Sequence, residues 1–351
     1  MQSVEREGER LAGLDIEEAL GKFSKLKILV FGDIVLDVER AGSAVSLAPE
    51  APVPLVRIER ENYHVGGAFN AVANAASLGV STAIVSVVGD DDGGRVVASR
   101  LKELGCNTDG LIVGEGMPTA TVERLIANNH MLLRVDKGFS SEPAEAVRDK
   151  AIDAYEKYVK SADAVVMISK YGNGILSKQT IDKAIEEAHK RGVEVFVNPR
   201  ADSAENYAGS DFLRLSRNEA SKITGIASIN DTSVRNMLIY LKSHSQAKNV
   251  AITWLEDNSY LLDAANKLHI IKPLAAKPLE APSTGLLGIG DRMLTVTAIM
   301  SASGYDKVVA LKTAMAIAYL AAAAKYEFGG SGELIKQLAS DANLKKWLES
   351  E

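Results

Sequence analysis

The chain has 351 residues, of which 46% are hydrophobic and 25% are charged, so it can bury a large core. Its net charge of −6 argues against a nucleic-acid partner, because such binding depends on neutralising phosphates with Lys and Arg. Cys106 is the only cysteine, which excludes a disulfide within the chain and a thiolate metal cluster. We expect Cys106 to be a small buried residue of a protein from a reducing compartment.

Residues 1–25 are charged and contain no apolar segment of signal-peptide length. We interpret them as an N-terminal helical extension with a short amphipathic helix over residues 15–23, and assign residues 26–351 to one domain. No uninterrupted apolar run of about 18 residues occurs, so the sequence predicts no membrane span. These observations favour a cytoplasmic protein.

Short apolar segments alternate with helical patterns along the chain. Such alternation is typical of a parallel sheet covered on both faces, so the predicted fold class is α/β, doubly wound, with a mostly parallel sheet. The apolar segment 306–332 predicts helix that is buried around most of its circumference. The predicted strands are 27–33, 82–90, 164–169, 193–199 and 249–254, and two of the predicted helices are 94–105 and 177–192.

Two segments break this alternation. Residues 48–60 carry three prolines and then alternate apolar with basic residues, and residues 118–136 also alternate. Period two suits strands with one open face, and proline confines the first segment to a sheet edge or an irregular entry. We predict a small β-sheet lid with segments near 38–63 and 115–136, and a homodimer formed through its open edges.

The segment Gly288-Ile289-Gly290-Asp291 precedes a long apolar helical pattern. In one interpretation the glycines form a turn and the aspartate caps the helix. In the other, backbone N–H groups converge on an anion at the helix N-terminus while the carboxylate accepts a proton. The motif alone does not decide between them.

Three further features precede this segment. Asp33 and Asp37 follow the first strand, at the carboxyl end where open α/β sheets bind ligands. Gly66 and Gly67 lead into a helix that carries Asn70 and Asn74 on one face, and "VGDDDGGR" follows at 88–95.

In this order the motifs resemble those of the ribokinase-like (PfkB) carbohydrate kinases, and within that family the kinases of D-glycero-D-manno-heptose 7-phosphate. The resemblance covers residues from about 26 to 335. It includes "GDIVLD", "APEAPVP", "GGAFNAVANAASLG", "NHMLLRVD", "ISKYGNG" and "VFVNPR".

The resemblance implies a three-layer core with a β-lid, ATP and Mg²⁺ as cofactors, and a sugar or sugar phosphate as the acceptor. It makes Asp291 the base, with the N–H groups of Gly288, Ile289 and Gly290 as an anion hole for the transferring phosphate. Asp37 remains open to an alternative interpretation as a simple turn residue. The substrate-binding residues that the resemblance implies are Asp33, Asp37, Gly66, Gly67, Asn70 and Arg134.

The nucleotide-side motifs depart from the family pattern. Ser216 replaces an asparagine, although Glu219, which would help to organise magnesium, is kept; Glu219 is otherwise a solvated charge. Trp254 follows the strand where glycines are expected. The predicted nucleotide-side residues are Arg200, Ser216, Glu219 and Thr253, together with Gly288 and Gly290.

Before the base, Gly285 and Leu287 replace an acid and a threonine. Potassium needs oxygen ligands, so we expect no potassium site. Arg200, Lys170 and Arg292 are candidates for positive charge supplied by other routes.

Two functions of different class remain open. The first is an ATP-dependent sugar or sugar-phosphate kinase with a rebuilt nucleotide site, and the second is a non-catalytic family member that acts as a sugar-binding or regulatory subunit. Retention of Asp291, together with the glycines that precede it, favours the kinase. We expect no nucleotidyltransferase domain, for which 351 residues leave no room.

Overall fold

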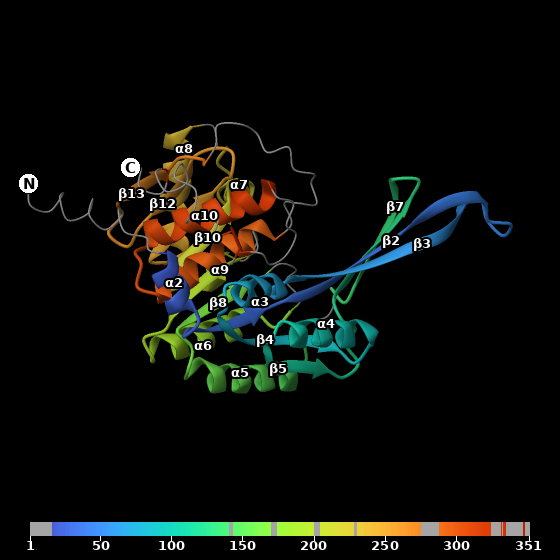
Figure 1. The fold of residues 1–351 in the computed structure, drawn as a ribbon, viewed down its shortest axis with the longest axis horizontal. Coiled ribbons are helices and arrows are strands. Elements are labelled where there is room, and N and C mark those ends of the chain that lie inside the picture. The colour runs from blue at the N-terminus through green and yellow to red at the C-terminus, as the bar shows by residue number, and fades with distance from the viewer. Residues whose placement is uncertain are drawn as a thin grey trace, which may run out of the picture.

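The computed structural model describes residues 16–139, 143–169, 174–199, 204–227, 230–274, 288–323, 331, 333–334 and 347. Two β-sheets organise these residues, a large one inside the body of the molecule and a small one in an arm that projects from it (Figure 1). Among the described helices, none has the combined length and apolar character needed to cross a membrane.

The large sheet has nine strands, of which seven run parallel and the last two along the chain pair antiparallel. In spatial order the strands are β13 (Leu268–Ile271), β12 (Ser259–Leu262), β11 (Asn249–Thr253), β10 (Phe212–Ser216), β9 (Glu194–Asn198), β8 (Ala164–Ile168), β1 (Lys27–Gly32), β4 (Ser81–Gly89) and β5 (Asn107–Gly114).

Helices cover both faces of this sheet (Figure 1). Alternate side chains of each strand enter opposite layers, because side chains of a strand point to its two faces in turn. In β9, for example, Phe196 belongs to the first core cluster and Val195 and Val197 to the second.

The first cluster packs against α2 (Ile16–Phe23), α3 (Ala68–Ser77), α4 (Asp92–Glu103), α9 (Ile289–Ala302) and α10 (Lys307–Ala323). The second packs against α5 (Glu145–Val159), α6 (Lys178–His189), the 3-10 turn η1 (Ala204–Tyr207), α7 (Arg217–Thr224) and α8 (Asp231–Ser245).

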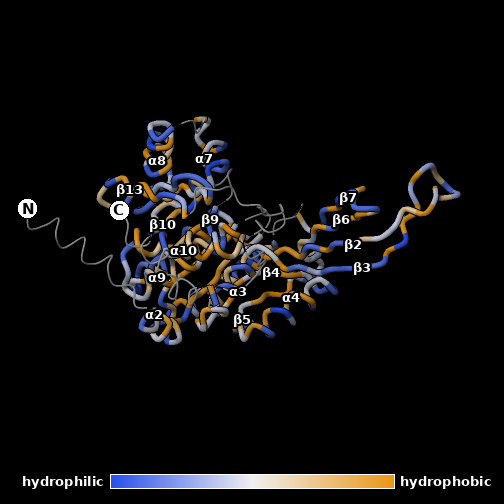
Figure 2. The backbone as a smooth tube through the Cα atoms, turned by 45° about the horizontal axis from the view of Figure 1, so that its top comes forward, coloured by the Kyte–Doolittle hydropathy of each residue, from blue (hydrophilic) through white to orange (hydrophobic). Residues whose placement is uncertain are grey.

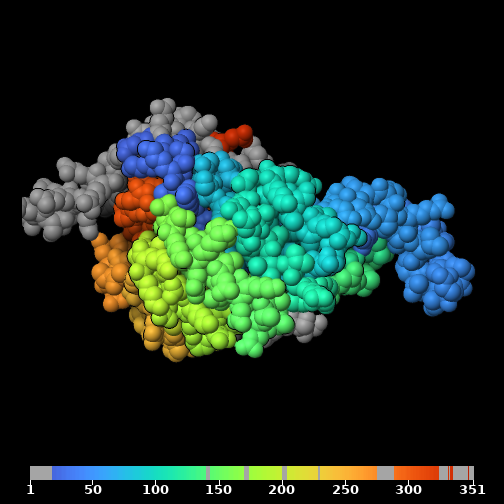
Figure 3. Space-filling view, turned by 90° about the horizontal axis from the view of Figure 1, so that it is seen from below, coloured from blue at the N-terminus to red at the C-terminus, as the bar shows by residue number. Residues whose placement is uncertain are grey.

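The small sheet is the lid. Its spatial order is β3-β2-β6-β7, in which β2 pairs antiparallel with β3 and parallel with β6. The long β2–β3 hairpin protrudes well beyond the body, and its strands mix apolar and polar segments (Figures 2 and 3). The lid strands are β2 (Ile34–Leu47), β3 (Pro54–Gly67), β6 (Thr121–Ala127) and β7 (His130–Lys137).

The predicted fold class is confirmed, lid included. Pro54 opens β3 at the edge of the lid, as the proline argument predicts. Cys106 is buried, and burial raises the pKa of its thiol to about 11. The sequence did not predict β10, because Arg214 interrupts its apolar pattern, or the short strands β12 and β13.

Candidate active site

Two helices begin at glycines with positive φ and meet at the carboxyl edge of the sheet. Gly67 (φ 67°) precedes α3 and Gly288 (φ 72°) precedes α9, and neither helix has a side-chain cap. A Cβ on Gly67 would lie 2.2 Å from the carbonyl oxygen of Asp33. Glycine is therefore required at the start of both helices. Because neither glycine carries a Cβ, the two helices can lie close together.

Asp291 lies in the first turn of α9 and is completely buried. Its Oδ2 accepts a hydrogen bond from Nδ2 of Asn70 in α3 (3.0 Å), and its Oδ1 accepts one from Nδ2 of Asn198 at the end of β9 (2.7 Å). The carboxylate thus contacts neighbouring elements and does not cap its own helix, so the capping interpretation of this aspartate is wrong.

The two asparagines keep unused acceptors. Asn70 Oδ1 and Asn198 Oδ1 are buried, and no described residue donates a hydrogen bond to either atom. A Cβ on Gly288 would lie 2.7 Å from Asn70 Nδ2, so the turn at Gly288 is in close contact with the Asn70 amide. Because buried polar atoms are usually paired, these two oxygens indicate a site with further hydrogen-bonding capacity.

A guanidinium lies on the other side of the first turn of α9. Arg214 in β10 is 5% exposed, and its Nε donates to Oγ1 of Thr253 (2.8 Å). Burial lowers the pKa of Arg214, while the charges of Glu219 and Asp291 act in the opposite direction. The nearest oxygen of Glu219 lies 3.8 Å from Arg214 Nη1.

Ser216 and Glu219 form a capping box at the start of α7. Ser216 Oγ accepts from the Glu219 N–H (3.3 Å), and Glu219 Oε2 accepts from the Ser216 N–H (2.7 Å). Glu219 is therefore an ordered helix cap, and its description as a merely solvated charge is wrong. The hydroxyl of Ser216, which replaces the family asparagine, serves the same cap.

The residues from Asn70 through Asp291 to Arg214, Thr253 and Glu219 thus form one connected polar cluster. Ile289 anchors it by burying its side chain in the core. Among the described residues, no group of three or more His, Cys, Asp or Glu side chains is arranged to hold a metal ion.

Other predicted site residues lie apart from this cluster. Asp33 lines a small hollow with Ser86, Met117 and Phe139, and neither Asn70 nor Asp291 borders that hollow. The Asp33 carboxylate packs against Gly174, where a Cβ would lie 1.5 Å from Oδ1.

Asp37 lies on lid strand β2 and pairs with Arg124 on β6. Asp37 lies within a strand, so its interpretation as a simple turn residue is wrong, and its substrate-binding role stays a prediction. The chain passes from β1 directly into the lid after Asp33, which carries Asp37 away from the core sheet.

Arg134 lies on β7, with its side chain 47% exposed, and donates two hydrogen bonds to Asp136. Gly66 lies at the base of β3, where the nearest atom to an added Cβ is 3.9 Å away. Arg200, Lys170, Gly285 and Leu287 lie outside the described residues.

Arg292 does not face the Arg214 side of the cluster. It is 2% exposed and its Nε donates to Oδ1 of Asn74 (2.8 Å), which also accepts from Ser331 (2.9 Å). Burial lowers the pKa of Arg292 to about 10. This arginine joins α9 to α3, and the cation near Gly290 is Arg214.

A family model matches most of the chain. The family model for "pfkB family carbohydrate kinase" matches residues 25–324. The chain belongs to the pfkB family of carbohydrate kinases. It shares its ribokinase-like fold, with the core and lid described above, with solved members of that group.

Two curated relatives are each named bifunctional protein HldE. The one from Campylobacter curvus is 33% identical over 326 residues, which cover 91% of this chain and 66% of the relative. The one from Campylobacter concisus is 32% identical over 299 residues, which cover 85% of this chain and 60% of the relative. The chain thus spans less than two thirds of the length of these relatives.

Two solved structures share the fold at low identity. Phosphofructokinase-2 from Escherichia coli, in a tetrameric inhibited form, superposes with a TM-score of 0.70 at 14% identity, covering 93% of this chain and 100% of that one. Ribokinase from Arabidopsis thaliana, complexed with ribose and ATP, gives 0.69 at 15% identity, covering 90% and 99%.

Proposed function

We propose that this pfkB-family chain transfers a phosphoryl group from ATP to a hydroxyl of a sugar or sugar phosphate, with Asp291 as the base. One observation carries the proposal. The Asp291 carboxylate lies in the first turn of the uncapped helix α9, held by amides from α3 and β9. An oriented base beside the N–H groups of a helix N-terminus is what phosphoryl transfer to an alcohol requires.

The proposed reaction is a single displacement. Asp291 accepts the hydroxyl proton as the hydroxyl oxygen forms a bond to the γ-phosphorus, and the bond from that phosphorus to the bridging oxygen breaks, releasing ADP. The N–H groups of Gly288, Ile289 and Gly290 stabilise the charge on the transferring group, where the positive end of the helix favours an anion. Positioning and electrostatics supply most of the catalysis in such reactions.

Asn70 and residues of the lid are proposed to bind the acceptor. Asn70 lies one turn from the positive-φ Gly67, and its unused Oδ1 can accept from a sugar hydroxyl. Asp37 and Arg134 are on the lid, and Asp33 borders a separate hollow that Asn70 does not line. The motif resemblance makes a heptose 7-phosphate our preferred acceptor, with Arg134 as a cation for its phosphate.

ATP is proposed to bind on the opposite side of Asp291, near Ser216, Thr253 and Arg200. The surroundings of Glu219 fit a metal ion poorly, because its carboxylate already caps α7 and lies 3.8 Å from a guanidinium nitrogen. No step above therefore passes through a metal ion held by the protein. Mg²⁺ and the metal role of Glu219 stay predictions.

A second function remains a candidate, namely a sugar-binding or regulatory subunit without catalysis. The observation that favours it is the complete burial of Asp291 with Arg214 packed against Gly290, which leaves little space at the base.

Two measurements on the purified chain separate these functions. The first is a screen of sugars and sugar phosphates for phosphate transfer from magnesium–ATP. The second is a pair of thermal titrations, since a ligand at about 100 times its Kd stabilises the fold by about 2.7 kcal/mol. Transfer, with melting shifts for both ligands, supports the kinase. A shift with sugar alone supports the binding subunit, and a shift with ATP but no sugar would contradict the assignment of the acceptor side.

We also propose a homodimer formed through the lid. Large apolar side chains on the lid are exposed, including Leu47 (66%), Met131 (62%) and Leu133 (54%), and β3 is an open edge. Exposed edges and apolar patches favour association. A monomeric mass by light scattering at micromolar concentration would contradict the dimer.

A further inference from the structure

Arg214 is a buried cation with unused donors. Thr253 Oγ1 accepts from its Nε, and its side chain is 6% exposed. Within the described part of the chain, no acceptor takes a hydrogen bond from Nη1 or Nη2; the ion pair with Glu219 spans 3.8 Å, beyond hydrogen-bond range. A guanidinium has five donors, so most of its capacity is open.

The guanidinium is aimed at the start of α9. A Cβ on Gly290 would lie 2.2 Å from Nη1, 2.9 Å from Cζ and 3.3 Å from Nη2, so only glycine allows this contact. Helix α9 has no side-chain cap, and the first N–H groups of a helix have no partner within it. Two sets of donors, one charged and one at a positive helix end, therefore meet at Gly290.

The carboxylates nearby do not saturate these donors. Asp291 is hydrogen-bonded by Asn70 and Asn198, and Glu219 by the Ser216 N–H. A buried charge whose hydrogen bonds are incomplete is costly, and an anion that accepted them would offset that cost. The planar guanidinium suits two oxygens of a phosphate.

We propose that Arg214 is an anion-binding residue of this chain, which binds a phosphate group with its Nη1 and Nη2 together with the first-turn N–H groups of α9. The site adjoins the proposed base, so the proposal rests on the proposed function for its place in a reaction, although phosphate binding is measured without turnover. The phosphate can belong to the nucleotide or to a sugar phosphate, and both share this chemistry.

The test titrates the full chain calorimetrically with inorganic phosphate in the presence of a metal chelator. We expect saturable binding that weakens roughly 10- to 100-fold in Arg214→Met, the range for hydrogen bonds to a charged group. Arg214→Lys should keep part of the affinity. Arg217→Met is the matched control, because the Arg217 guanidinium stacks on Trp254 (4.3 Å) and pairs with Asp257 (2.9 Å).

Thr253→Val covers the case in which Arg214→Met does not fold. It removes the hydroxyl that orients Arg214 at nearly constant volume, so phosphate affinity should fall several-fold. Absence of saturable phosphate binding by the wild type, or wild-type affinity in Arg214→Met, overturns the proposal. If Arg214→Met does not fold, wild-type affinity in Thr253→Val overturns it.

Parallel titrations of the wild type and Arg214→Met with ATP, ADP and a hexose phosphate identify the source of the phosphate. The source is the ligand whose affinity depends on Arg214. Phosphate binding without any transfer activity would refute the proposed kinase and leave this proposal standing.

Discussion

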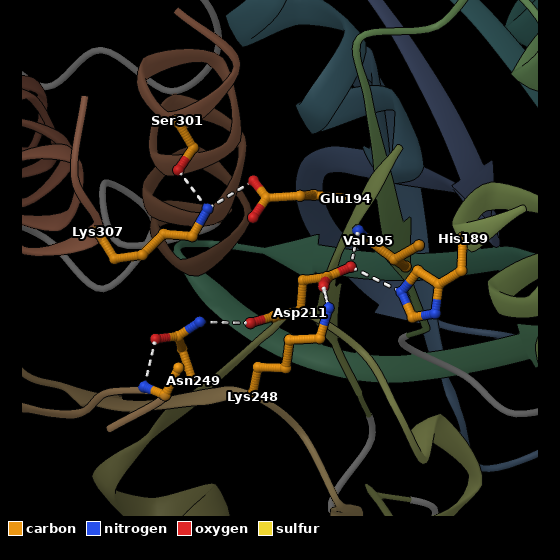
Figure 4. A network of polar contacts seen from close by, with 9 residues as sticks. His189, Glu194, Val195, Asp211, Lys248, Asn249, Ser301 and Lys307 are labelled. Atoms are coloured by element: carbon orange, nitrogen blue, oxygen red, sulfur yellow. Dashed lines mark hydrogen bonds and ion pairs between the residues drawn. The ribbon is translucent and has the colours of Figure 1, made fainter. Parts of the chain in front are cut away.

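Two buried carboxylates lie at opposite ends of the strands of the large sheet and have different environments. Asp211, at the start of β10, accepts hydrogen bonds from the Val195 N–H (2.8 Å), His189 (2.9 Å) and Lys248 (2.6 Å) (Figure 4). Asp291, at the carboxyl end, accepts hydrogen bonds from two neutral amides, Asn70 and Asn198, whose oxygens have no described donor. The first carboxylate accepts hydrogen bonds at both of its oxygens, one of them from the cationic Lys248, so it is suited to stability. The second keeps capacity to accept a proton.

The comparison predicts that each carboxylate controls a different property. Asp291→Asn should lower turnover roughly 10²- to 10⁴-fold, the usual contribution of a positioned base. Folding should be nearly unchanged, because Asn70 or Asn198 can rotate its amide and present Oδ1 to the new NH₂ group. Steady-state kinetics and a melting curve check both statements. Unchanged turnover would remove Asp291 from the mechanism.

Asp211→Asn should show the reverse. It keeps the shape of the side chain but loses the charge that Lys248 and His189 stabilise, so the free energy of unfolding should fall by about 2 kcal/mol. Turnover per folded molecule should stay at the wild-type level, because Asp211 lies at the other end of the sheet. Urea unfolding measures the loss, and equal stability of both proteins would contradict a stabilising network.

The pH dependence of stability sharpens this result. Burial alone raises the pKa of Asp211, but the hydrogen bonds from Lys248, Val195 and His189 outweigh it and hold the pKa below 3.8. Its contribution is therefore complete above about pH 4 and is lost as the pH falls through the lower native pKa. The stability difference between wild type and Asp211→Asn should therefore shrink as the pH falls below about 4.

Asn198→Asp would place a second carboxylate 2.7 Å from Asp291, at the carboxyl end of the parallel strands. A like charge at this distance disfavours the ionised form of the base. The acid limb of the turnover profile should move to higher pH. Asn198→Leu, which adds no charge, is the control, and an equal movement in both variants would contradict the electrostatic cause.

The smallest expected effect is that of potassium. Gly285 and Leu287, which lie outside the described residues, carry no side-chain oxygen for a hard cation, so activity should be the same with potassium or a bulky organic cation at constant ionic strength. A several-fold activation would show that other oxygens form a potassium site.

The sequence by itself determined the fold class and pointed to Asp291 as the proposed base. Continuous apolar strands alternating with helices specify a covered parallel sheet, and alternating residues specify a lid with an open face. The glycines of "GGAFN" and "GIGD" identified the two helix starts, since a positive φ is a local property that glycine adopts most readily.

Only the tertiary structure decided which side chains surround Asp291. Phe196 and Asn198 share one face of β9, and Phe212 and Arg214 share the same face of β10, so a period-two pattern places both polar residues toward α9. Strand β10 was not predicted from the sequence, and strand order and helix docking were needed to bring residues 70, 198, 214 and 291 together. Contacts between residues so distant in the chain depend on packing of the whole core, which no local pattern encodes.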